Sequence, residues 1–196
     1  MEVVELMIGY VRGSGWPAIE GLKIVPRTHL YENFGHLAVT QPIREAHAKG
    51  VTDLILTSSV GGLRYKPGTV VNIMDHINLT GRSPKLGFAE MGNVWSWQFA
   101  PDTLPHAILA VVRGPEYETP AEAQMLRNLG ADVVGMSMAL EAMTAHHLGM
   151  RVVGLSLVTD EAGAPVTHQE VLDFAKANEE HLTALVEETR VRLTNE

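Results

Sequence analysis

A carboxylate at position 118 lies where the sequence predicts the junction between a strand and a helix. The apolar stretch 107–112 predicts a strand, and Gly114-Pro115 ends it. After Glu118, the run Thr119-Pro120-Ala121-Glu122 is typical of a helix start, because Thr caps, Pro suits the first turn and Glu stands three residues after the cap. Open α/β sheets bind ligands at such junctions, so Glu118 is a candidate binding residue, although a solvated turn would have the same composition.

Four predicted strands end in small or polar side chains, and these strands are 53–57, 107–112, 132–135 and 152–158. The carboxyl ends of parallel strands share one edge of a sheet, where ligands bind. We therefore expect the residues that follow the strands to converge on one site. They are Ser58, Ser59 and Gly61 in a loop of small residues; Tyr117 and Glu118; Met136 and Ser137; and Thr159 and Asp160.

The composition limits the class of protein and of chemistry. The 196 residues, 45% hydrophobic and 19% charged, predict one globular domain spanning 1–196. A net charge of −8 disfavours general binding of nucleic acid or anionic membranes. The absence of cysteine excludes disulfides and thiol catalysis, and the nine histidines lack ligand spacing, so we expect no metal. No signal segment or membrane-length apolar run is present, which predicts a cytoplasmic protein.

Strands and helices alternate along the chain. We expect helices at 37–49, 121–129 and 139–148 and one long terminal helix from about Thr167, with further extended stretches at 3–11, 22–26 and 69–78. The segment 85–105 has no clear period and is expected to be irregular. This alternation predicts a three-layer α/β fold, with a mainly parallel mixed sheet flanked by helices.

Five sequence blocks carry a resemblance to a known family. They are RTHLYE at 27–32, TSSVGGL at 57–63, DHINLTG at 75–81, GPEYET at 114–119 and LGADVVGMS at 129–137. These blocks resemble the trimeric-type purine nucleoside phosphorylases and their methylthioadenosine-cleaving relatives. The blocks follow the order of the family, and the similarity continues from position 154 through Asp160 to His168. The resemblance implies a nucleoside phosphorylase-like fold and a homotrimer.

The resemblance also implies the reaction. The family cleaves the N-glycosidic bond of a purine nucleoside with phosphate, which gives the free base and ribose 1-phosphate. Inorganic phosphate is the co-substrate, and no other cofactor is expected. Positive charge develops on the sugar and negative charge on the purine, so an anion below the sugar and a hydrogen bond to N7 would stabilise the transition state.

The roles implied for individual residues divide the site into three parts. Phosphate would be bound by Arg27, His29, the amide of Ser59 and the hydroxyl of Ser137. The ribose would contact Tyr31, Met136 and His168, with His168 reaching its 5′-hydroxyl. The base would lie against Tyr117, with Glu118 on its N1 edge and Asp160 as the acid near N7.

The side chain at position 160 is expected to select between 6-oxopurine and 6-aminopurine bases. Family members specific for 6-oxopurines have asparagine at the matching position, whereas this chain has a carboxyl group. A protonated carboxyl group can donate to N7, and its other oxygen can accept from a 6-amino group. We therefore expect a preference for 6-aminopurine nucleosides.

The chain departs from the family in two regions. The family's glycine- and serine-rich phosphate loop is missing at its usual distance before Arg27, and Gly13-Ser14-Gly15 is interpreted as a hairpin turn. The region between Gly81 and Ala107 is also shorter, and its aromatic side chains either cover the site or pack in the core or at an interface; they are Trp95, Trp97 and Phe99. An incomplete phosphate site leaves two alternatives, a phosphate-independent nucleoside hydrolase and a non-catalytic nucleoside-binding protein.

Overall fold

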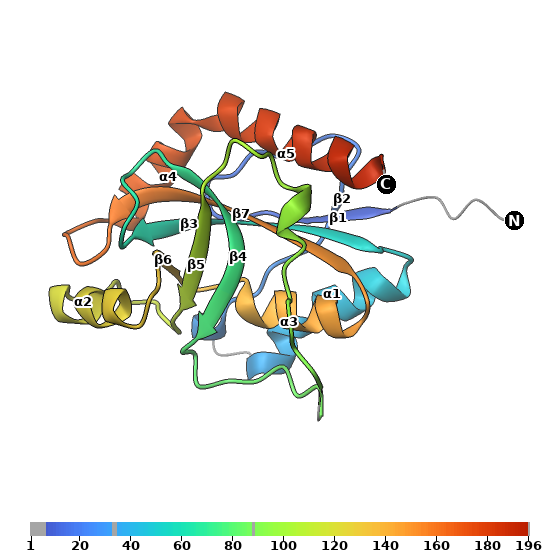
Figure 1. Cartoon of the computed structure of the whole chain (residues 1–196), viewed down its shortest axis with the longest axis horizontal. Coiled ribbons are helices and arrows are strands. Elements are labelled where there is room, and N and C mark those ends of the chain that lie inside the picture. Colours follow the sequence, from blue (N-terminus) through green and yellow to red (C-terminus); the bar gives the residue numbers. More distant parts are fainter. Residues whose placement is uncertain (1–6, 33–34, 88, 196) are drawn as a thin grey trace, which may run out of the picture.

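Seven strands form one mixed sheet with helices on both of its faces (Figure 1). The computed structural model describes residues 7–32, 35–87 and 89–195. The strands are β1 (Ile8–Val11), β2 (Lys23–Ile24), β3 (Asp53–Gly62), β4 (Val70–Asn78), β5 (His106–Val111), β6 (Val133–Gly135) and β7 (Arg151–Glu161). The helices are α1 (Gly35–Ala48), α2 (Pro120–Asn128), α3 (Ala139–His147), α4 (His168–Ala177) and α5 (Glu179–Thr194), with short 3₁₀ turns η1 (Leu30–Glu32) and η2 (Trp97–Phe99). The predicted fold class is confirmed.

The sheet closes on itself through β3. Its strand order is β2-β1-β3-β6-β5-β4-β7, and β3 also pairs with β7 in parallel. The pairs β3–β6 and β4–β7 are antiparallel, while β1–β2, β1–β3, β4–β5 and β5–β6 are parallel. Five strands therefore form a closed ring, which leaves β2 as the one edge strand among the described residues and brings the ends of β3, β6 and β7 together.

Both faces of the central strands are buried, as their continuous apolar runs predict. In β3, Leu54 and Leu56 pack in the hydrophobic cluster that includes Ile43 of α1 and Ala142 of α3. Ile55 points to the other cluster, which includes side chains of α5. This alternation follows from the two-residue period of a strand, and it fixes β3 firmly between the two helical layers.

Two expected boundaries are wrong. The small residues 58–62 do not form a loop: they continue β3, which pairs with β7 up to Gly62. A side chain at Gly62 would lie 2.1 Å from the carbonyl oxygen of Tyr65, so glycine permits a close backbone approach there. The expected long terminal helix is two helices, because the side chain of Asn178 donates to the carbonyl oxygen of Phe174 at 2.8 Å, which ends α4.

Other expectations agree with the structure. Thr119 caps α2, with Pro120 in its first turn and a reciprocal capping box to Glu122. The described residues of the segment 85–105 are irregular except for η2. The expected extended stretch 3–11 yields β1, and its residues 3–6 lie outside the described residues.

The aromatic side chains of the shortened region pack inside the fold. Trp95 and Phe99 are buried in the two main hydrophobic clusters, and Trp97 is half-buried with its ring centroid 4.9 Å from that of His106. The indole N–H of Trp95 donates to Nδ1 of His76 at 3.1 Å. Trp95 and Phe99 are therefore part of the core, Trp97 packs against His106, and none of the three lines the cavity described below.

Candidate functional site

A cavity of about 350 Å³ opens where β3, β6 and β7 meet. Its volume lies at the lower end of the range for small-molecule sites. All ten residues predicted to bind substrate or phosphate line this cavity, although their individual roles stay predictions. They are Arg27, His29, Tyr31, Ser59, Tyr117, Glu118, Met136, Ser137, Asp160 and His168.

The expected reason for the convergence holds only in part, because β3 pairs with β7 in parallel and β5 with β6 in parallel, but these two pairs meet through an antiparallel contact. The sequence predicted a shared edge of parallel strands, but β3 and β6 run antiparallel, with Gly61 opposite Val134. The ring closure brings the last residues of β3 beside β6, and β7 runs parallel to β3 on its other side, with Gly61 opposite Asp160. Small residues at the end of β3 leave the space that the cavity occupies.

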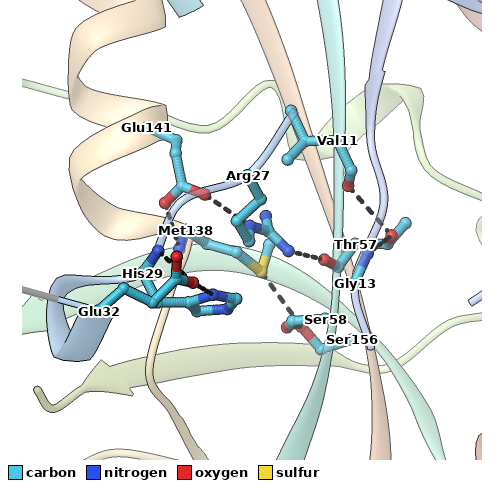
Figure 2. A network of polar contacts seen from close by, with 10 residues as sticks. All are labelled: Val11, Gly13, Arg27, His29, Glu32, Thr57, Ser58, Met138, Glu141 and Ser156. Atoms are coloured by element: carbon cyan, nitrogen blue, oxygen red, sulfur yellow. Dashed lines mark hydrogen bonds and ion pairs between the residues drawn. The ribbon is translucent and has the colours of Figure 1, made fainter. Parts of the chain in front are cut away.

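The buried cationic side chain of Arg27 lines the cavity, and Figure 2 shows its polar contacts. Its Nε donates to Oε1 of Glu141 at 2.7 Å, and its Nη1 donates to the carbonyl oxygen of Thr57 at 2.6 Å. The Arg27 side chain is only 5% exposed, and its buried Nη2 has no hydrogen-bond partner among the described residues. A guanidinium group binds oxyanions through such free N–H groups, so the part of the cavity wall formed by Arg27 suits phosphate.

His29 lies beside Arg27 and is held from two sides. Its Nδ1 lies 3.0 Å from Oε1 of Glu32, and its ring stacks on that of Tyr31 with centroids 4.7 Å apart. Burial lowers the pKa of His29, although the hydrogen bond to Glu32 acts in the opposite direction. The lowered pKa favours the neutral ring. With the proton on Nδ1, facing the carboxylate, Nε2 becomes an acceptor. It then suits a phosphate oxygen that carries a proton.

The segment Gly13-Ser14-Gly15 is not a hairpin turn. The strands it connects, β1 and β2, pair in parallel, and Ser14 lines the cavity. Three hydrogen bonds tie the segment to β3: Gly13 N to Thr57 Oγ1 at 2.9 Å, Trp16 Nε1 to Ser58 O at 2.9 Å, and Ser59 Oγ to Ser14 O at 2.8 Å. This short loop therefore forms part of the cavity wall beside β3.

Glycine is required at position 13. An added Cβ would lie 2.6 Å from both the Cα of Ser58 and the carbonyl oxygen of Thr57. Only a residue without a side chain allows the loop to approach β3 this closely. The hairpin-turn interpretation rested on the short separation of this loop from Arg27 in the sequence. Because β2 is only two residues long, the short connection between this loop and Arg27 is enough for Ser14 and Arg27 to line the same cavity.

Two carboxyl groups line another part of the cavity. Burial raises the pKa of Asp160, although the hydroxyl of Thr159 donates to its Oδ1 at 2.8 Å. Burial also raises the pKa of Glu118, with a further contribution from the charge of Asp160. The pKa of Tyr117 is raised by burial and by both carboxylates. A raised pKa favours the protonated form of a carboxyl group, in which the group can act as an acid.

Two helix starts supply the remaining predicted residues. His168 is the first residue of α4, after the cap Thr167, and Val171 one turn later is buried at the cavity. Ser137 stands just before Met138, the residue that precedes α3. Helix starts expose unpaired N–H groups, so both positions favour polar or anionic ligand groups.

Sequence reasoning missed Ser14, Val171 and Glu141. Val171 was assigned only to the apolar face of the terminal helix. Glu141 lies in the expected helix 139–148 among apolar residues, and it is 2% exposed. A lone carboxylate within an apolar helix segment indicates a buried polar contact, because a buried charge requires a partner. The sequence could not identify that partner as Arg27.

Within the described residues, no group of three or more His, Asp or Glu side chains is placed to hold a metal ion. No helix in the same part of the chain is both long and apolar enough to cross a membrane. The expectations of no cofactor, no nucleic-acid partner and a cytoplasmic location stay predictions.

Comparison with known proteins agrees with the resemblance in the sequence blocks. The family described as "Phosphorylase superfamily" matches residues 35–189. Purine nucleoside phosphorylase of Cellulomonas sp is 43% identical over 174 residues, which cover 82% of this chain and 62% of the relative. The enzyme of that name from Mycobacterium tuberculosis is 38% identical over 185 residues, covering 87% and 69%. The chain thus spans roughly two thirds of the length of these relatives.

Solved structures agree as well. Schistosoma mansoni purine nucleoside phosphorylase in complex with adenosine has a TM-score of 0.84 and 27% identity, covering 94% of this chain and 90% of that one. A Schistosoma purine nucleoside phosphorylase in complex with guanosine has a TM-score of 0.86 at 27% identity, covering 96% and 91%. On the family match and the identity over most of its length, this chain belongs to the phosphorylase superfamily and, within it, to the purine nucleoside phosphorylases.

Proposed function

We propose that this chain cleaves the N-glycosidic bond of a purine nucleoside by phosphorolysis, giving the free base and a pentose 1-phosphate. The observation that carries the proposal is the chemical division of one cavity. A buried guanidinium group with a free N–H, that of Arg27, lines it together with two carboxyl groups whose pKa is raised, those of Glu118 and Asp160. Arg27 bonds to the carbonyl oxygen of Thr57, whereas Asp160 lies opposite Gly61, nearer the end of β3, so the cation and this carboxyl group lie at different positions along the strand. This arrangement suits an oxyanion and a purine bound side by side in the cavity.

The proposed mechanism assigns each group a step. Phosphate, bound by Arg27, His29, Ser59 and Ser137, would stabilise the positive charge that develops on the sugar and then bond to its anomeric carbon. Asp160 in its protonated form would donate to N7, so that the purine leaves as a neutral base. Glu118 would orient the base, and His168 would bind the 5′-hydroxyl. No covalent intermediate with the protein is needed.

The loop at Ser14 favours phosphorolysis over hydrolysis. The hydrolase alternative depended on one wall of the phosphate site being missing, whereas Ser14 lines the cavity and is hydrogen-bonded to Ser59, a predicted phosphate ligand. Its tight attachment to β3 supports a preformed anion site, since binding to a preformed site costs little ordering entropy.

We further propose that 6-aminopurine nucleosides are preferred. The support is Asp160, whose buried side chain and raised pKa suit a group that donates to N7 and accepts from a 6-amino group. A homotrimer in the cytoplasm is proposed on the resemblance alone. Light scattering coupled to size-exclusion chromatography tests the trimer, and a monomer mass would contradict it.

The test of the proposed function is release of base from adenosine, inosine and methylthioadenosine, each with and without phosphate, followed by chromatography of the products. Release that requires phosphate and yields the sugar 1-phosphate is the expected result. Release of free sugar without phosphate would instead establish a hydrolase. Binding of nucleosides without release would establish a non-catalytic binding protein.

A further inference from the structure

One buried carboxylate joins two parts of the cavity wall that are far apart in the sequence. Oε1 of Glu141 accepts from Nε of Arg27 at 2.7 Å, and Oε2 accepts from the backbone N–H of Met138 at 2.6 Å (Figure 2). The Glu141 and Arg27 side chains are only 3% and 5% exposed. Each carboxylate oxygen of Glu141 therefore accepts one hydrogen bond from a different partner, and both bonds are shielded from solvent.

The bond to Met138 fixes the start of α3. Met138 has a positive φ of 84°, a conformation that costs free energy in a residue other than glycine. The carboxylate of Glu141 accepts the backbone N–H of this residue and so holds the strained turn in place. Ser137, directly before the turn, lines the cavity, so its orientation depends on the same bond.

The bond to Arg27 fixes the direction of its guanidinium group. Nε is bound to Glu141 and Nη1 to the carbonyl oxygen of Thr57, so the plane of the group is set by two partners. Nη2, which has no partner among the described residues, is left for a ligand. Thr57 in turn accepts from the amide of Gly13 through its hydroxyl, which connects the Ser14 loop to the same network.

We propose that Glu141 is the positioning residue of the phosphate site: it aligns Arg27 and Ser137 without touching phosphate. This inference rests on the proposed phosphorolysis. Glu141 also neutralises Arg27 in the empty site, so that a buried cation is not left unpaired before phosphate binds.

The test compares the phosphate KM, measured at saturating nucleoside, for the wild type and for E141Q, R27M and the double variant R27M/E141Q. A glutamine amide keeps one acceptor oxygen, and its NH₂ group cannot accept from the second partner, so E141Q loses one of the two bonds. We expect E141Q to raise the phosphate KM about tenfold or more and to leave the Kd for nucleoside, measured without phosphate, within about twofold. In the R27M background, E141Q is expected to raise the phosphate KM by a much smaller factor.

Asp53 offers a matched control. Its carboxylate is buried at the start of β3 and pairs with Arg151, whose side chain is partly exposed, and neither residue lines the cavity. D53N removes a buried carboxylate that is likewise paired with an arginine, so it should lower the melting temperature and leave the phosphate KM unchanged. E141D, which keeps the charge but is one methylene shorter, is the second variant if E141Q does not fold, and it should also raise the phosphate KM.

The outcomes separate the two proposals. A wild type without phosphate-dependent cleavage overturns the proposed function, and the role of Glu141 with it. A wild type that depends on phosphate, with a folded E141Q or E141D whose phosphate KM is that of the wild type, overturns the role of Glu141 alone. The role of Glu141 is also overturned if E141Q raises the phosphate KM by the same factor in the R27M background as in the wild type. It is overturned as well if E141Q raises the Kd for nucleoside by as large a factor as the phosphate KM.

Discussion

The hydroxyl of Ser59 donates a hydrogen bond of 2.8 Å to the carbonyl oxygen of Ser14, forty-five residues earlier in the chain. This bond holds the short loop after β1 against the last part of β3. The family resemblance assigns only the amide of Ser59 to phosphate. In the structure its side chain instead holds the loop at Ser14, which also lines the cavity, against β3.

Ser59→Ala is therefore expected to weaken phosphate binding more than nucleoside binding. Loss of this hydrogen bond should cost about 1 kcal/mol of stability and raise the phosphate KM about fivefold, because the loop is no longer fixed. Steady-state kinetics with phosphate varied, together with urea denaturation, measures both effects. Thr189→Val is the control, since it removes a buried hydroxyl bonded to Leu185 in α5, away from the cavity. Equal changes in the phosphate KM of both variants would contradict the proposed role of the loop.

Asp160→Asn should change which base is released. The asparagine amide can no longer supply an acidic proton to N7, and it presents a different donor pattern to the 6-position. We expect kcat/KM for adenosine to fall by about 10²-fold or more, and that for inosine to fall much less. Parallel assays of the two nucleosides measure the ratio, and Asp173→Asn, at an exposed carboxylate on α4, is the control. An unchanged adenosine rate would remove Asp160 from the role of acid.

The same substitution should stabilise the fold in a pH-dependent way. Burial raises the pKa of Asp160 above its ordinary value of 3.8, so the folded state binds this proton more tightly than the unfolded state does. The stability that this proton provides is complete below the unfolded pKa and is lost as the pH rises through the folded pKa. The asparagine side chain does not titrate.

We therefore expect the melting temperature of the D160N variant, relative to the wild type, to rise as the pH increases through the folded pKa of Asp160 and then to level off. Scanning calorimetry across a pH series measures this difference. Glu118→Gln should show the same direction, because burial also raises the pKa of Glu118. A difference in melting temperature that is constant with pH would contradict the raised pKa.

Trp95→Phe should destabilise the fold and leave the kinetics intact. The indole is 1% exposed, and its N–H donates to Nδ1 of His76 at 3.1 Å. Loss of this bond and of part of the ring should cost about 1–3 kcal/mol, which denaturant unfolding measures. The KM for nucleoside and for phosphate should stay within error of the wild-type values. A raised nucleoside KM without loss of stability would instead favour a covering role for this aromatic segment.

The sequence by itself determined the elements whose signals are local. The cap at Thr119, the proline that follows it and the glutamate at position 122 specify the start of α2, because these groups satisfy backbone donors within one turn. The apolar runs of β3 and β7 specify strands buried on both faces. The resemblance of the sequence blocks to a known family was enough to select ten residues that line the cavity.

Only the tertiary structure decided the contacts between distant segments. The closure of the ring through β3 and β7, which brings the cavity residues together, depends on pairing across about a hundred residues. The loop at Ser14 and the buried link from Glu141 to Arg27 were invisible to local patterns, because their partners lie 45 and 114 residues away. Residue types and turn chemistry act over one turn or one strand, whereas a binding site is fixed by hydrogen bonds and packing between segments that meet only after folding.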